Sequence, residues 1–184
     1  MLTMTFLVKT IIDLYAMILL LRVWMQWART DFYNPLAQFV VRLTQPIIGP
    51  LRRVIPALGP IDTASLLVAF ILMTIKYPLL LLIQSGEITF SAYNLLFGLI
   101  SLVKTAGYLV FWAIIVRAIM SWVSQGRSPL DYVLHQLTEP LMAPVRRIIP
   151  AMGGLDFSAM VVILVLYLLN YLGMDTFGPI WAIL

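Results

Sequence analysis

The sequence predicts an all-α membrane protein with four transmembrane helices in two parallel repeats, each with a cytoplasmic interfacial amphipathic helix. Of the 184 residues, 62% are hydrophobic and 11% are charged, whereas about 25% of the residues of a soluble domain are charged. Four windows are long and apolar enough to span a bilayer, and one segment of the chain occurs twice. This composition argues against a soluble enzyme, a disordered chain and a soluble nucleic-acid-binding domain.

The four expected spans are residues 10–27, 64–83, 102–122 and 158–174. The first resembles a signal peptide, but no basic stretch precedes its apolar run and Asp13 interrupts it. No small-residue cleavage signal follows, so we expect a retained helix. The apolar segment 176–184 is too short to span, and its Trp181 suggests an anchor at the membrane interface.

The strongest feature of the sequence is an internal repeat. Residues 43–62 (LTQPIIGPLRRVIPALGPID) align without gaps with residues 137–156 (LTEPLMAPVRRIIPAMGGLD), and 11 of the 20 positions are identical. The similarity extends into the flanking spans, which predicts two structural repeats, residues 1–94 and 95–184. Each repeat contains two spans, so both repeats enter the membrane from the same side and are parallel. Such a repeat is explained by duplication and fusion of the two subunits of a former dimer. The alternative is a repeat that shapes a transport path.

Each repeat is expected to carry a short amphipathic helix between its two spans. Asn34 and Ser128 each precede a proline, a pattern typical of a helix start. Apolar residues then recur at helical spacing over about ten residues, too few to span a bilayer. This helix should lie in the interface or under the bundle. Proline disfavours a continuing helix, so both helices are expected to end near Pro46 and Pro140.

The positions of the basic residues predict the orientation. The connection between the second and third spans, QSGEITFSAYN, contains Glu87 and no basic residue. The positive-inside rule therefore places the two long connections in the cytoplasm and both termini outside. The arginines of these two connections are Arg29, Arg42, Arg52, Arg53, Arg127, Arg146 and Arg147.

Two arginine pairs in the repeated segment are candidate binding residues, Arg52–Arg53 and Arg146–Arg147. Guanidinium groups bind phosphates well, so these pairs are expected to recognise anionic lipid headgroups or an acidic partner. The alternative is that they only determine topology and are solvated or snorkel.

Arg22 and Arg117 lie roughly 7 Å inside the inner ends of their spans, at 1.5 Å per residue. Asp62 and Asp156 begin the neighbouring spans, where they are expected to cap the helices. We therefore expect the pairs Arg22–Asp62 and Arg117–Asp156. Snorkelling of the two arginines to the headgroups is the alternative.

Asp13 and Lys76 lie deeper and at equal predicted depth, since each is fourteen residues from the inner end of its span. A structural ion pair between the first two spans is the main interpretation. A proton or cation relay and a position at the outer interface are the alternatives. The pair is not repeated, because Tyr108 and Asn170 occupy the matching positions.

The residues that carry enzyme chemistry are missing from the sequence. It has no cysteine, no nucleophile–base arrangement, no glycine-rich phosphate loop and no paired catalytic carboxylates. His135 and Glu139 are four residues apart, but no third metal ligand is near, so an ordinary surface pair is expected. We expect no catalytic activity, no cofactor and no metal site.

The duplicated motif P-x3-P-x-R-R-x-I-P-x-x-G-x-x-D, with Arg and Trp before it, resembles the YggT (YlmG) family of integral membrane proteins in its two-repeat bacterial form. The resemblance covers nearly the whole chain. It implies a multi-pass protein of the bacterial inner membrane without enzyme activity. It suggests roles in osmotic-stress tolerance, in membrane-protein or haem-protein assembly in chloroplast relatives, and in division or nucleoid placement. The motif residues are Pro46, Pro50, Arg52, Arg53, Pro56, Gly59 and Asp62, and Pro140, Pro144, Arg146, Arg147, Pro150, Gly153 and Asp156.

These observations predict a non-catalytic scaffold or assembly protein that supports osmotic or envelope stress tolerance through lipid or partner binding at its cytoplasmic face. The expected partners are membrane lipids, mainly anionic ones, and a further copy of the chain or another membrane protein, with no direct contact to nucleic acid. The alternative function is a small transporter or channel. Its charged intramembrane path would be lined by Asp13, Lys76, Arg22 and Arg117.

Overall fold

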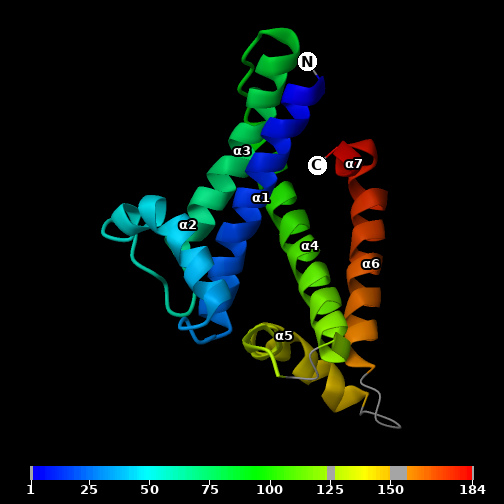
Figure 1. The fold of residues 1–184 in the computed structure, drawn as a ribbon. Helices are drawn as coiled ribbons and strands as arrows, with labels where there is room; N and C mark the ends of the chain where they lie inside the picture. Colours follow the sequence, from blue (N-terminus) through cyan, green and yellow to red (C-terminus); the bar gives the residue numbers. More distant parts are fainter. Residues whose placement is uncertain (1, 124–126, 150–156, 184) are drawn as a thin grey trace. The chain divides into compact units, whose positions relative to one another are not determined.

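The computed structural model describes residues 2–123, 127–149 and 157–183, and these residues are mainly helical (Figure 1). Within these ranges there is no β-strand, only an isolated bridge between Leu58 and Ile61. The all-α class predicted from the sequence is therefore confirmed. The helices are α1 (Leu2–Trp27), α2 (Pro35–Leu51), α3 (Thr63–Ser85), α4 (Tyr93–Val123), α5 (Pro129–Ile148), α6 (Ser158–Phe177) and α7 (Pro179–Ile183).

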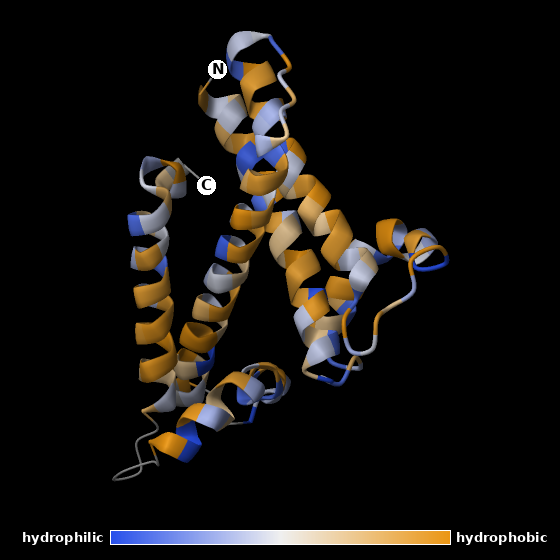
Figure 2. Ribbon diagram, turned by 180° about the vertical axis from the view of Figure 1, so that it is seen from behind, coloured by the Kyte–Doolittle hydropathy of each residue, from blue (hydrophilic) through white to orange (hydrophobic). Residues whose placement is uncertain are grey.

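Four of these helices are long and apolar enough to cross a membrane: α1, α3, α6 and the Tyr93–Ser121 part of α4. They correspond to the four predicted spans, and Figure 2 shows that they are apolar over most of their length. All four are longer than expected at the end away from the arginine-rich connections; α4, for example, begins at Tyr93 instead of residue 102. Helical hydrogen bonding continues beyond the apolar window into less hydrophobic turns, which a search by hydropathy leaves out.

The chain divides into two compact units. The first comprises Met1–Trp27 and Val40–Ala106, and the second comprises Ala28–Phe39 and Gly107–Leu184. In the first unit, α1 packs along α3, and the two helices run side by side in Figures 1 and 2. In the second unit, α5 and α7 each pack on α6.

Small buried residues bring α1 and α3 together. Ala16 of α1 and Ala64 and Ala69 of α3 are completely buried, and so are the larger Leu19 of α1 and Met73 of α3. Small side chains allow two membrane helices to approach closely and to gain dispersion contacts. The core of the first unit therefore forms on one face of each helix, and the remaining apolar side chains face outward.

The prediction that Pro46 and Pro140 end the amphipathic helices is wrong. α2 contains two internal prolines and continues to Leu51, and α5 likewise continues past its two prolines to Ile148. Both helices are thus nearly twice as long as expected.

The reason is that the buried face of α2 continues beyond Pro46. Val40, Thr44 and Ile48 follow one another at four-residue spacing, and all three are buried. Pro46 and Pro50 lie on the exposed side, so the carbonyls that lose their N–H partners face outward. An internal proline costs about 3 kcal/mol in a helix, and the packing of Thr44 and Ile48 offsets this cost.

Three predicted N-caps are present. Asn34, Ser128 and Asp62 each accept a hydrogen bond from a backbone N–H two or three residues later, at 2.8, 3.2 and 3.3 Å. These bonds satisfy donors at the helix start that have no partner within the helix. The predicted cap Asp156 lies outside the described residues.

Trp181 is buried against α6, and its expected place at the membrane interface stays a prediction. Its Nε1 donates to Asn170 Oδ1 at 3.0 Å, and its ring stacks on that of Phe177. α7 therefore turns the end of the chain back onto α6, where Gly173 leaves room for the indole.

We expect Gly98→Ala to destabilise the first unit by about 1–3 kcal/mol, because it overpacks the contact between α4 and α3. A Cβ at Gly98 would lie 2.9 Å from the backbone N and Cα of Thr74. Gly107→Ala is the matched control on the same helix, because a Cβ there meets nothing within 4 Å. Thermal unfolding in detergent measures both variants, and equal melting temperatures would contradict the close contact.

Candidate functional site

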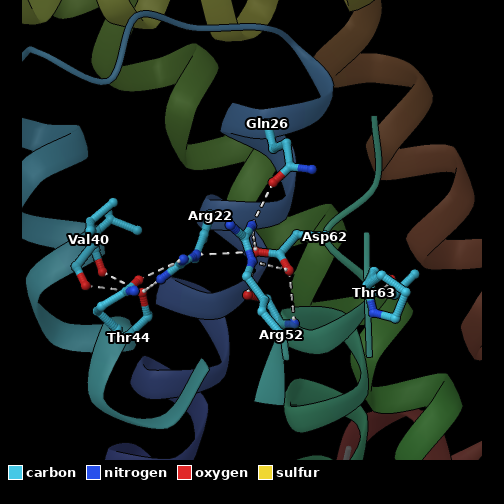
Figure 3. A network of polar contacts seen from close by, with 11 residues as sticks. Arg22, Gln26, Val40, Thr44, Arg52, Asp62 and Thr63 are labelled. Carbon is cyan, nitrogen blue, oxygen red and sulfur yellow. Dashed lines mark hydrogen bonds and ion pairs between the residues drawn. The ribbon is translucent and has the colours of Figure 1, made fainter. Parts of the chain in front are cut away.

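A network of charged side chains surrounds Asp62 at the start of α3 (Figure 3). Asp62 is 0% exposed. Its Oδ2 accepts from Arg22 Nε at 3.1 Å, Arg52 Nη2 at 2.6 Å and Ser65 Oγ at 2.8 Å. Its Oδ1 accepts from the Ser65 backbone N–H and from Arg52 Nε, each at 3.3 Å. This carboxylate therefore combines a helix cap with two ion pairs.

Arg22 enters the network from α1, and all its nitrogen groups have partners. Beyond the bond to Asp62, its Nη1 donates to Thr44 Oγ1 at 2.5 Å and its Nη2 to Gln45 Oε1 at 3.0 Å. The Thr44 hydroxyl in turn donates to the Val40 carbonyl at 2.7 Å. The Arg22–Asp62 pair expected from the sequence is present, and it ties α1, α2 and α3 together.

Arg52 approaches Asp62 from the segment that follows α2. Its Nη2 also donates to Gln26 Oε1 of α1 at 2.6 Å. Its side chain is 36% exposed, whereas those of Arg22 and Asp62 are buried. Arg52 is thus the edge of the network that other molecules can reach.

The network has two guanidinium groups and one carboxylate, so it holds one positive charge in excess. Burial raises the pKa of Asp62, but the hydrogen bonds from Arg52 and Ser65 outweigh burial and hold the pKa of this carboxyl below its ordinary value. Asp62 therefore stays ionised at neutral pH. The hydrogen bonds of the network are used to hold helices together. Its excess positive charge can attract anions to the exposed edge at Arg52.

The two arginines of each predicted pair have different surroundings in the structure. Arg52 binds Asp62, whereas Arg53 is exposed, without a side-chain hydrogen bond or ion pair among the described residues. In the second copy, Arg146 Nη2 donates to Glu139 Oε2 at 2.9 Å, and Arg147 is exposed. The first arginine is thus used inside the protein and the second faces outward.

Arg117 of the second unit makes a contact that matches one made by Arg22. Its Nη1 donates to Thr138 Oγ1 at 2.5 Å, and the Thr138 hydroxyl donates to the Leu134 carbonyl at 2.7 Å. Thr138 aligns with Thr44 in the repeated segment. Arg117 Nη1 also lies 2.7 Å from Met142 Sδ. The expected Arg117–Asp156 pair lies outside the described residues.

A second polar cluster lies deeper, between α1, α3 and α4. Lys76 Nζ is 2.9 Å from Asp13 Oδ1 and 3.4 Å from Ser101 Oγ, and Lys76 is 1% exposed. Tyr77 Oη lies 2.6 Å from the same Ser101 hydroxyl, and the ammonium lies 5.2 Å from the centre of the Tyr77 ring. The Asp13–Lys76 ion pair expected from the sequence is present, and its role stays a prediction.

His135 and Glu139 form the surface pair that their spacing predicts, with 3.5 Å between Nε2 and Oε2. Glu139 also binds Arg146. Within the ranges that the structure describes, no group of three possible metal ligands is found.

Sequence reasoning missed the polar partners of these charges: Gln26, Thr44, Gln45 and Ser101. The position of Gln26 could have predicted its role, because it lies one helical turn after Arg22 and so on the same face of the helix. That of Thr44 could have done so too, because the threonine recurs in the second copy at the same place. That of Ser101 could not, because its contact depends on how α4 packs against α3.

Comparison of the sequence with known proteins identifies its family. The sequence model of one family, described as CCB3/YggT, matches residues 1–83 and 96–177. The uncharacterized protein YggT of Escherichia coli is 61% identical over 168 residues, covering 91% of this chain and 87% of the relative. An uncharacterized protein in the proC 3' region of Vibrio alginolyticus is 57% identical over 180 residues, covering 97% of each chain.

A more distant relative also aligns over most of its length. An uncharacterized protein of Haemophilus influenzae is 38% identical over 179 residues, covering 96% of this chain and 94% of the relative. No solved structure matches the chain. The family match spans both copies of the arginine motif, and the chain therefore belongs to the CCB3/YggT family.

Proposed function

We propose that the protein is a non-catalytic scaffold of the bacterial inner membrane. It holds anionic lipids, or the acidic surface of a partner membrane protein, at its cytoplasmic face, and it thereby supports assembly under osmotic or envelope stress. In this proposal the two sequence repeats are parallel, and the long connections face the cytoplasm because they contain the arginines. Both termini then lie in the periplasm.

One observation carries this proposal: each copy of the motif leaves one arginine for external contacts. Arg53 and Arg147 are exposed, while Arg52 and Arg146 bind carboxylates of the chain itself, Asp62 and Glu139. A planar guanidinium binds phosphate or carboxylate in a two-point geometry. The internal arginine fixes the backbone beside its neighbour, so the exposed group is presented from a held position.

The surface of α2 supports a position at the membrane interface. Phe39, Leu43 and Ile47 are exposed apolar residues at four-residue spacing. Gln38 and Arg42 are exposed on the polar side of the same helix. A helix with an uncovered apolar stripe beside a polar, basic face is typical of one that lies in the headgroup region.

The contacts of the intramembrane charges favour a scaffold over the transporter or channel alternative. Lys76 is buried and paired with Asp13, and Arg22 is buried with a partner for each nitrogen. Charges that line a conducting path must face water or exchange partners. Flux through liposomes that depends on Asp13, measured with Asp13→Asn, would support the transport alternative and contradict the scaffold.

Lipid retention tests the proposal directly. We expect the Arg53→Gln/Arg147→Gln variant to lose about ten-fold or more of its retained anionic phospholipid, measured by native mass spectrometry after extraction, because each lost charge-assisted bond is worth about 1.5–3 kcal/mol. Arg29→Gln/Arg127→Gln is the matched control, since it removes two other exposed arginines and the same net charge. Equal lipid loss in both variants would show a general charge effect and contradict a site at the motif.

Growth after osmotic downshift tests the cellular part. A strain that lacks its own copy is complemented with each of the two double variants. Rescue by the control variant but not by the motif variant supports the proposal, and equal rescue contradicts it.

A further inference from the structure

The segment between α2 and α3, residues 53–61, is here called the apolar loop. It projects from the helices of the first unit in both ribbon views (Figures 1 and 2). Apart from Arg53 its side chains are apolar, and Val54 and Leu58 are 80% and 70% exposed. Contiguous exposed apolar residues are unfavourable in water and indicate a contact surface.

The apolar loop is held in one shape from its base. Arg52 and Asp62, the residues on either side of it, are joined by an ion pair of 2.6 Å. Thr63 Oγ1 donates to the Pro56 carbonyl at 2.7 Å. Gly59 adopts a φ of 61°, a conformation that suits glycine. A loop that is already ordered loses little entropy when it binds.

Most backbone N–H groups of the apolar loop are either absent or hydrogen-bonded within the protein. Pro56 and Pro60 have no N–H to satisfy. The N–H groups of Arg53, Val54, Ile55, Leu58 and Ile61 donate to backbone carbonyls at 2.8–3.2 Å. Within the apolar loop, all of which the structure describes, only the N–H groups of Ala57 and Gly59 have no backbone partner. Unsatisfied backbone groups are what keep irregular segments out of the hydrocarbon. Among the loop carbonyls only those of Pro56, Leu58 and Ile61 accept a hydrogen bond within the protein, so the loop suits the hydrated headgroup level better than the hydrocarbon itself.

The start of α3 sets the depth of the apolar loop. α3 has 23 residues and is therefore about 34 Å long at 1.5 Å per residue, close to the roughly 30 Å of bilayer hydrocarbon. Asp62 thus lies near a hydrocarbon boundary, and the loop anchored on it lies at headgroup level. The exposed apolar stripe of α2 leads directly into this loop along the chain.

We infer that the apolar loop inserts into the cytoplasmic leaflet, with Val54 and Leu58 at the boundary of headgroups and acyl chains and Arg53 at the phosphates. Aliphatic side chains beside one cationic group match the layering of a phospholipid surface. The choice of leaflet rests on the proposed orientation, whereas the insertion itself does not depend on it. The loop thereby gives the first unit a contact with the membrane surface in addition to its spanning helices.

Site-specific labelling tests this inference cleanly, because the chain has no cysteine. Leu58→Cys and Val54→Cys are labelled separately with bimane in the full-length protein, reconstituted in neutral phosphatidylcholine vesicles. Two controls bracket the result. Ile71→Cys marks an exposed position on the α3 span, and Glu87→Cys marks an exposed polar position between α3 and α4.

The inference predicts quenching of both loop labels by lipids brominated high on the acyl chain, to about half or more of the quenching at Ile71→Cys. It also predicts quenching by aqueous iodide at least about three-fold weaker than at Glu87→Cys. Iodide quenching equal to that at Glu87→Cys would place the loop in water and overturn the inference. Protection that disappears on dilution of the protein in the membrane would assign the loop to contacts between copies and overturn it too.

Failure of this inference is distinguishable from failure of the proposed function. Insertion is read from bromine quenching in neutral lipid, which requires no anionic headgroup. Lipid retention by the arginine variants is read by mass and requires no insertion. Suppose that iodide quenches the loop labels while Arg53→Gln/Arg147→Gln still loses anionic lipid as the proposed function predicts. This result would overturn insertion alone.

Discussion

Replacing Asp62 by alanine is expected to lower the free energy of unfolding by about 3–5 kcal/mol. The change leaves the buried guanidinium of Arg22 without its carboxylate, and it removes the cap of α3. It also releases Arg52, which closes the base of the apolar loop. Three losses thus follow from one substitution, because a single carboxylate serves all three groups. Unfolding in mixed micelles with increasing SDS measures the effect.

Two further variants separate charge from hydrogen bonding at this position. Asp62→Asn keeps an acceptor for the Ser65 N–H but loses the charge, so its stability should lie between those of the wild type and Asp62→Ala. Glu87→Ala removes an exposed carboxylate elsewhere and should change stability by less than about 0.5 kcal/mol. If Asp62→Ala were as stable as Glu87→Ala, the network would not hold α1, α2 and α3 together.

The ion pairs were predictable because depth along a membrane helix follows from residue number. Asp13 and Lys76 each lie fourteen residues from the inner end of a span, and a rise of 1.5 Å per residue puts them at one level. Arg22 and Asp62 were paired because both lie near the inner ends of neighbouring spans. Burial of a charge in an apolar environment demands a partner at the same depth, so few candidates remained.

What the sequence could not show was the course of the chain through its prolines. Propensity ends α2 near Pro46, but the buried contacts of Thr44 and Ile48 continue the helix. Tertiary structure also decides that Arg52 binds Asp62 while Arg53 is exposed. The two residues are chemically identical, and only the turn after α2 decides which of them faces Asp62. Tertiary packing determines both outcomes, and it leaves no local pattern in the sequence.

The Asp13–Lys76 pair should show strong and asymmetric coupling. Asp13→Leu leaves an ammonium that is 1% exposed, and it is expected to cost about 3–5 kcal/mol. Lys76→Leu leaves a carboxylate that is partly exposed, so it should cost less. The double variant places two apolar side chains in an apolar contact, and it should be more stable than Asp13→Leu by at least about 1.5 kcal/mol. A double-mutant cycle of unfolding free energies measures this coupling.

Additivity at a distant position provides the control for that cycle. Arg53 lies in the apolar loop and makes no contact with Asp13 among the described residues, so Asp13→Leu and Arg53→Gln should add within about 0.5 kcal/mol. If the Asp13–Lys76 cycle were equally additive, the pair would not stabilise the fold, and the two charges would need another reason to lie 2.9 Å apart within the membrane. A higher free energy of unfolding in the double variant than in Asp13→Leu would instead show that the two charges stabilise the fold only together. Either charge alone destabilises the span, and the ion pair joins α1 to α3.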